Sequence, residues 1–177
     1  MVSNVTSDPA FWGFAIPVVI LIILGWIAAF VGGGTNGHWH QRGHHWDKAP
    51  FNIVGLIVWT IALLLFAWAA YKVDGAVLTQ TQRMFLRTWF GFAIVFGFLF
   101  VILLYFFHQM AFAIVALIFL FIILVGLIIQ YSFISISAAW MTFILLVVSI
   151  FMLHTLSSSI ERNMAAYGTE KVMATIV

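Results

Sequence analysis

The chain alternates between long apolar runs and short polar interruptions. Between Thr88 and Ser159 it contains no Asp, Glu, Lys or Arg. Each charge at the centre of a bilayer costs roughly 2.5–3.5 kcal/mol on insertion scales, so this exclusion indicates a lipid environment. A helix needs about 20 apolar residues to cross the hydrocarbon core. The pattern therefore predicts five membrane-spanning helices, at about 11–32, 51–72, 85–107, 111–130 and 134–156.

Polar residues mark the breaks between these runs. His108-Gln109 divides the third run from the fourth, and Gln130–Ser132 divides the fourth from the fifth. Residues 72–87 are polar enough to lie outside the membrane or at its surface. A polar loop is expected at 33–50 and a polar C-terminal tail at 157–177.

The runs are rich in Phe, Ile and Val, which in water would favour strands. In lipid, an open sheet leaves backbone groups without hydrogen bonds, and the alternation typical of a barrel is absent. The predicted fold is therefore all-α: an integral, multi-pass membrane protein whose five transmembrane helices form one bundle, in a single membrane domain covering residues 1–177.

An odd number of spans also predicts sidedness. The N-terminus, the 72–87 segment and the turn near 130–133 share one side of the membrane. The 32–50 loop, the turn at 108–110 and the C-terminal tail share the other, so all six histidines fall on or near that second side. The Lys and Arg residues are divided too evenly to show which side is cytoplasmic.

Composition narrows the function classes. The chain is 65% hydrophobic and 7% charged, with no cysteine, which excludes disulfides and thiolate metal ligands. A net charge of +2 gives no argument for nucleic acid. The expected partners are the lipid bilayer and either further copies of this chain or other membrane subunits. Neither a nucleophile–base arrangement nor a carboxylate pair is visible, which argues against an enzyme.

The polar loop concentrates the residues that could bind metal. It carries four histidines, at His38, His40, His44 and His45. Imidazoles bind copper and zinc without thiolates, so these four could form a metal site. Gly37 and Gly43 flank the cluster, however, and no regular element is expected to hold the ligands in place. A solvated loop at the membrane surface is the other interpretation.

Aromatic residues suggest a ligand site in the same region. Trp39 and Trp46 lie in the loop, Pro50 fixes its exit, and Trp59 follows about two turns into the second helix. These residues could close over a planar ligand by stacking. The second helix also carries small residues that let a neighbouring helix approach closely, namely Ala62, Ala67, Ala69 and Ala70.

Three short motifs resemble a known family. They are the second-helix segments Pro50–Thr60 and Ala69–Val73, the Phe106-Phe107-His108 triplet, and Phe133–Ala139 near the start of the fifth helix. Together with five spans and a long first loop, they resemble the TspO family of tryptophan-rich sensory or translocator proteins. This resemblance implies a pocket for a flat apolar ligand of the porphyrin or sterol class, with the 33–50 loop as its lid.

Some family features are missing. The paired prolines reduce to Pro50, and aliphatic residues and Phe replace the expected Asn and Trp of the third helix around Phe98–Leu103. Two alternatives to ligand binding therefore stay open. One is a non-catalytic structural or accessory subunit of a larger membrane complex of respiratory or photosynthetic type. The other is a membrane protein that binds copper or zinc through the loop histidines. A tetrapyrrole is the cofactor that the family resemblance implies.

Overall fold

Five helices make up the bundle, and each is long and apolar enough to cross a membrane. The computed structural model describes residues 8–31, 39–41, 44–46, 53–107 and 109–167, with the backbone alone at 39–41, 44–46 and 162–167. The helices are α1 (Pro9–Val31), α2 (Ile53–Asp74), α3 (Gln80–Val101), α4 (Met110–Ile134) and α5 (Ile136–Tyr167), and a π-helical turn, η2 (Ile102–Phe106), continues α3. The predicted five-helix membrane bundle is confirmed.

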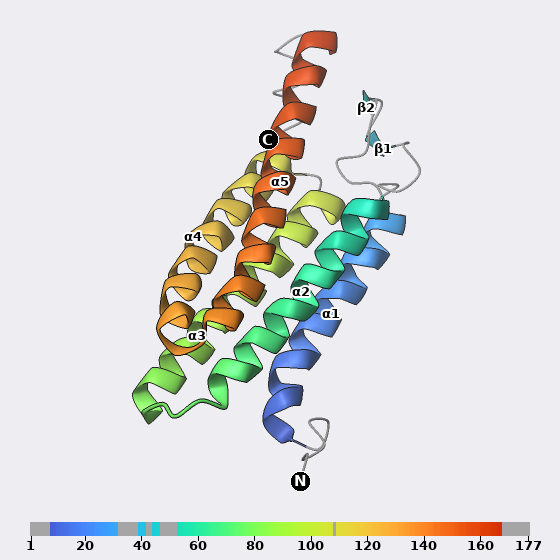
Figure 1. Ribbon diagram of the computed structural model, residues 1–177. Helices are drawn as coiled ribbons and strands as arrows, with labels where there is room; N and C mark the ends of the chain where they lie inside the picture. The colour runs from blue at the N-terminus through green and yellow to red at the C-terminus, as the bar shows by residue number, and fades with distance from the viewer. Residues whose placement is uncertain (1–7, 32–38, 42–43, 47–52, 108, 168–177) are drawn as a thin grey trace.

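The helices form a closed ring. Helix α1 packs against α2 and α3, α2 packs against α5, and α4 packs between α5 and α3. Figure 1 shows the N-terminus, the α2–α3 connection and the α4–α5 turn at one end of the bundle, which we call the N-terminal end. The last turns of α5 lie at the opposite end. This arrangement agrees with the sidedness expected from the odd number of spans.

A short hairpin lies beyond the second end, next to α1 and α2 in Figure 1. Strands β1 (Trp39–Gln41) and β2 (His44–Trp46) pair antiparallel, with Trp39 opposite Trp46 and His40 opposite His45. The glycines that flank the histidines predicted no regular element here. That expectation is wrong for residues 39–41 and 44–46, which hold each other through backbone pairing. We call this the hairpin end.

Three helix boundaries differ from their predicted positions by four residues or more. Helix α3 begins at Gln80 rather than 85, because the Thr79 side chain caps the Gln82 backbone N–H and Gln82 caps Thr79 in return. The α4–α5 break lies at Ser135, whose backbone is extended, rather than at Gln130–Ser132. Helix α5 continues to Tyr167 instead of ending at 156. At the last two boundaries the helix continues through polar residues because hydroxyls there bond to its own backbone: Ser132 donates to the Ile129 carbonyl and Ser159 to the Thr155 carbonyl.

Buried hydroxyls in α5 follow that rule. Thr142 donates a hydrogen bond to the Ala138 carbonyl at 3.0 Å, and Ser149 donates to the Leu145 carbonyl at 2.8 Å. These groups are therefore satisfied inside their own helix and need no partner on a neighbour.

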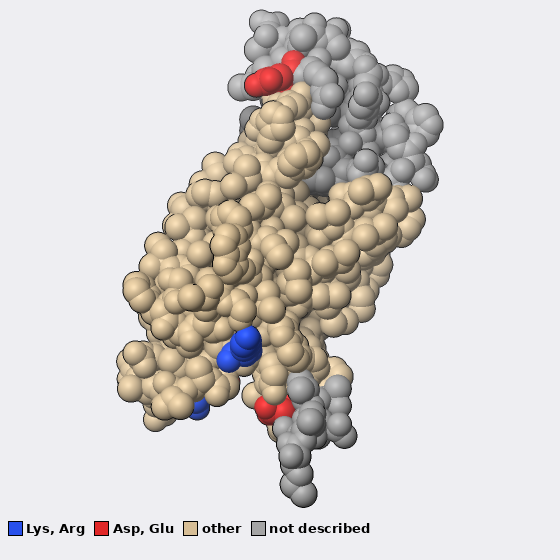
Figure 2. Space-filling model, viewed as in Figure 1, with Lys and Arg blue, Asp and Glu red and all other residues tan. Residues whose placement is uncertain are grey.

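Small residues let the helices approach closely, as the sequence predicted for α2. Its four small residues named above, at 62, 67, 69 and 70, are all buried. Large apolar side chains on every helix are exposed on the outside of the bundle. On the face of the molecule seen in Figure 2, the zone between the two ends shows no Lys, Arg, Asp or Glu. Such a surface is stable in lipid and would aggregate in water.

Candidate functional site

The interior of the bundle contains a cavity to which all five helices contribute. It is lined by Leu21 of α1, Trp59, Leu63 and Phe66 of α2, Ala93, Ile94, Gly97 and Phe100 of α3, Leu117 and Leu120 of α4, and Leu145 of α5. We call it the Trp59 cavity. Every lining side chain is apolar except for the indole N–H, so the cavity suits hydrocarbon or a flat ring rather than a charged group.

Trp59 forms the aromatic wall of this cavity. Only 4% of its surface is exposed. It lies six residues after the start of α2, which places it about 9 Å from the hairpin end of that helix. The cavity is therefore closer to the hairpin end than to the N-terminal end at this wall.

Two glycines make room for the side chains around the cavity. A Cβ atom added to Gly25 of α1 would lie 2.5 Å from Cζ3 of Trp59, and one added to Gly97 of α3 would lie 2.9 Å from Cδ2 of Leu21. Both distances are too short for non-bonded carbons. Gly25 is thus required for the indole to lie where it does.

A second tryptophan fixes α1 to α2 beside this contact. The Trp26 indole N–H donates to Oγ1 of Thr60 at 3.1 Å, and that hydroxyl donates to the Leu56 carbonyl at 2.8 Å. Because Thr60 follows Trp59 directly, the Trp26–Thr60 hydrogen bond links α1 to α2 one residue from the cavity wall.

The other ligand and metal residues predicted from sequence lie in the first loop. Trp39 and Trp46 are paired across the hairpin ladder, as are His40 and His45, and Gln41 is paired with His44. Their side chains, together with His38 and Pro50, lie outside what the structure describes. The predicted lid and the predicted copper or zinc site therefore stay predictions.

The remaining histidines give no further site among the described residues. His154 is exposed in the second half of α5, and His108 lies outside the described residues. Within the described side chains, no three or more His, Asp or Glu residues lie close enough together to hold a metal ion.

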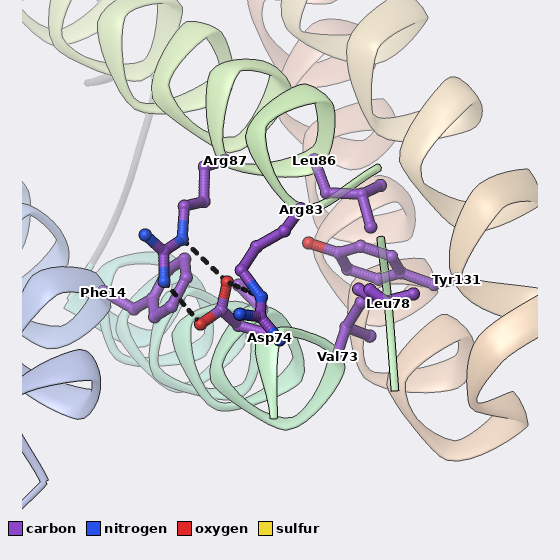
Figure 3. A pocket seen from close by; sticks show the side chains of 9 residues that line it. Phe14, Val73, Asp74, Leu78, Arg83, Leu86, Arg87 and Tyr131 are labelled. Carbon is purple, nitrogen blue, oxygen red and sulfur yellow. Dashed lines mark hydrogen bonds and ion pairs between the residues drawn. The ribbon is translucent and has the colours of Figure 1, made fainter. Parts of the chain in front are cut away.

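Sequence reasoning missed an ionic cluster at the N-terminal end. Asp74 ends α2, Arg83 and Arg87 lie in the first turns of α3, and Tyr131 lies in the last turn of α4. Figure 3 shows these side chains around a small pocket. The sequence signal was available: Arg83 and Arg87 are one helical turn apart and so share a face.

Comparison with protein families identifies a relationship over most of the chain. The model of the TspO/MBR family matches residues 15–160. This range includes all five helices apart from the first turns of α1 and the last turns of α5. Comparison with curated proteins and with solved structures gave no match.

Proposed function

Because this chain belongs to the TspO/MBR family of membrane proteins, we propose that it binds a flat apolar ligand between its helices, at the Trp59 cavity. The porphyrin and sterol classes are the candidates. The observation that carries this proposal is the position of Trp59, a buried indole on the wall of an interior space lined by all five helices. An aromatic wall with aliphatic surroundings favours a ligand that stacks and buries apolar surface.

The lining restricts the ligand at this depth. Aliphatic and phenyl groups offer no hydrogen bonds, so a polar substituent placed among them would lose its water without replacement. The polar edge of a bound ligand should therefore point toward an end of the bundle. The hairpin end is favoured, because Trp59 is near it.

Binding requires side chains to move. The cavity measures about 10 Å³, which is room for roughly one water molecule, whereas pockets for drug-sized ligands measure about 300–1,000 Å³. The Trp59 indole is the largest ring that lines the cavity, and it rests on Gly25, which has no side chain to hold it. Displacement of this indole, with a small separation of α1 from α2, is the proposed route of opening.

Residues 33–50 would then act as the lid over the hairpin end. In this proposal Trp39 and Trp46 cover the ligand, and Pro50 sets the direction in which the chain enters α2. The antiparallel pairing of Trp39 with Trp46 supports it, since the hairpin keeps the two residues side by side.

The direct test is a titration of the detergent-purified protein with protoporphyrin IX. Binding is monitored by porphyrin absorbance, because the fluorescence of eight tryptophans would not report on one site. Replacing Trp59 by Phe should weaken binding by about two- to threefold, because an aromatic contact contributes roughly 0.5–1.5 kcal/mol beyond area burial and the smaller phenyl ring keeps part of it. Trp39→Phe and Trp46→Phe should also weaken it if they form the lid. Competition with cholesterol distinguishes the porphyrin class from the sterol class.

Trp140→Phe is the matched control. This tryptophan is 63% exposed and belongs to α5 at the N-terminal end, far along the bundle from the proposed opening. Equal loss of porphyrin binding in Trp59→Phe and Trp140→Phe would contradict the proposed site. If the parent protein bound neither protoporphyrin nor cholesterol, ligand binding would be wrong and the accessory-subunit interpretation would be favoured.

A further inference from the structure

The ionic cluster at the N-terminal end holds one unbalanced positive charge. Both oxygens of Asp74 accept hydrogen bonds from Arg87, one from Nε and one from Nη2, each at 2.7 Å. In this bidentate pair, both carboxylate oxygens are engaged by the same arginine. The Asp74 side chain is only 9% exposed, so this pair is fixed between α2 and α3.

Arg83 is held less firmly by the same carboxylate. Its Nε lies 3.9 Å from Oδ1 of Asp74, which is within ion-pair distance but beyond hydrogen-bond reach. That Nε atom is buried and has no hydrogen-bond partner among the described residues. The side chain as a whole is 40% exposed, so an outside group can reach it.

Since one carboxylate faces two guanidinium groups, the cluster keeps a net positive charge. Arginine stays protonated at any physiological pH, so the charge cannot be lost by titration. Figure 3 shows Asp74 between the two arginines, with the Tyr131 hydroxyl on the Arg83 side. The pocket that Arg83 helps to line measures about 10 Å³, which is room for roughly one water molecule, so a larger anion would lie outside it, against the exposed part of Arg83.

The rest of this pocket is apolar. Besides the ionic cluster and Tyr131, it is lined by Phe14, Ala70, Val73, Leu78 and Leu86. Its position at the ends of α2, α3 and α4 corresponds to the depth where lipid head groups meet hydrocarbon. A cation beside an apolar surface at this depth suits an amphiphile whose head is an anion.

We propose that Arg83 binds the phosphate of an anionic membrane lipid at the mouth of this pocket. Guanidinium groups recognise phosphate through paired, charge-assisted hydrogen bonds, and interfacial basic residues attract anionic lipids. Free phosphate offers the same chemistry. The lipid is favoured as its source because Arg83 lies where the helices leave hydrocarbon, and Leu78, the one apolar lining residue that is partly exposed, can contact the glycerol. This site lies at the opposite end of the bundle from the proposed lid and does not depend on ligand binding at Trp59.

The test is thermal unfolding in a nonionic detergent with three additives, each measured separately. These are dioleoylphosphatidylglycerol, dioleoylphosphatidylcholine and inorganic phosphate. Phosphatidylglycerol should raise the Tm of the parent protein by roughly 2–6 °C at saturation, and the other two additives should not. Arg83→Gln should remove this increment, and Arg83→Lys, which keeps the charge, should retain part of it.

Lys72→Gln is the matched control, because it removes one exposed cation at the same end. Lys72 Nζ is 2.6 Å from Oγ of Ser137 and does not line the pocket. Its variant should keep the phosphatidylglycerol increment. Equal loss in Lys72→Gln and Arg83→Gln would overturn a specific site, as would an unchanged increment in Arg83→Gln.

Two further outcomes are decisive. If inorganic phosphate alone raises the Tm and Arg83→Gln removes that rise, Arg83 binds phosphate but the lipid source is wrong. If Arg83→Gln does not fold, Asp74→Asn provides the second measurement. It frees Arg87 and should enlarge the phosphatidylglycerol increment, and a smaller increment would contradict the proposal.

Discussion

At the scale of single residues, Gly25 and Trp59 show how a membrane bundle gains specificity. Lipid chains are as apolar as the side chains between helices, so burial in itself does little to select one packing over another. Shape therefore decides which surfaces meet. The indole of Trp59 fits against α1 only because position 25 has no side chain.

Replacing Gly25 by Ala should lower the Tm. The new methyl would lie 2.5 Å from the indole, and overpacking of this kind costs about 1–3 kcal/mol. Gly13→Ala is the control on the same helix, because nothing lies within 4 Å of a Cβ at that position. Thermal unfolding in detergent compares the two, and equal Tm values would contradict the packing argument.

Tyr105 offers a second prediction at this scale. It is 4% exposed, lies in η2, and its hydroxyl has no hydrogen-bond partner among the described residues. An unsatisfied buried hydroxyl costs roughly 1–3 kcal/mol, so Tyr105→Phe should raise the Tm. Thermal unfolding with Tyr71→Phe as the contrast provides the measurement, since Tyr71 donates to Oδ2 of Asp8 and its variant should lose stability. A lower Tm for Tyr105→Phe would show that its hydroxyl is bonded.

At the scale of the elements, the five-residue α2–α3 connection, 75–79, is held from both sides. The Thr79–Gln82 capping box starts α3, and the Asp74–Arg87 pair ties its second turn to the end of α2. These polar contacts lie where the helices leave hydrocarbon. Hydrogen bonds to charged groups are worth about 1.5–3 kcal/mol each before solvent screening, so they can fix an angle between helices that packing alone leaves free.

Asp74→Asn should therefore destabilise the bundle by about 1–2 kcal/mol. Loss of a fully buried pair would cost more, but Arg87 is 52% exposed and water screens part of the effect. Glu161→Gln makes the same chemical change at an exposed position of α5 and should leave the Tm unchanged. Thermal unfolding with no added lipid measures both variants. A similar Tm for the two would mean that the ion pair does not stabilise the α2–α3 contact.

At the scale of the whole molecule, the arrangement of the helices fixes which residues share a membrane side. The chain has no cysteine, so labelling of a single introduced cysteine reports on that position only. His40→Cys in β1 and Glu161→Cys in α5 should react with a membrane-impermeant maleimide from one side. Val77→Cys, in the α2–α3 connection, should react only from the other. Labelling of positions 77 and 161 from the same side would contradict the five-span topology.

Much of this architecture follows from the sequence alone. Stretches of about 20 apolar residues without charge must be helical in lipid, because only a helix satisfies its own backbone there. The number of spans, their antiparallel order and the membrane location follow from that one constraint. The ends of the helices were less predictable, since the polar residues at Gln130–Ser132 and Ser157–Ser159 lie within helices rather than between them.

The candidate site could be predicted only in part. Trp59 was predicted as a ligand residue from its type and its place in the second helix. The structure places it on the wall of an interior cavity, and its role in binding stays a prediction. Its partner Gly25, the Trp26–Thr60 hydrogen bond and the Asp74 cluster were not anticipated. Each of these joins residues on different helices, so each depends on how the helices are rotated about their axes.

That rotation is what the tertiary structure decided. In a water-soluble bundle, a polar outer face marks the buried side of each helix in the sequence. Here both faces are apolar: Leu56 and Leu63 are buried on α2, while Ile57 and Leu64, one residue further on, are exposed. The sequence thus determined that five helices cross the membrane and where. Which faces meet, and hence where the cavity and the unbalanced arginine lie, depended on the fit of small residues against large ones between neighbouring helices.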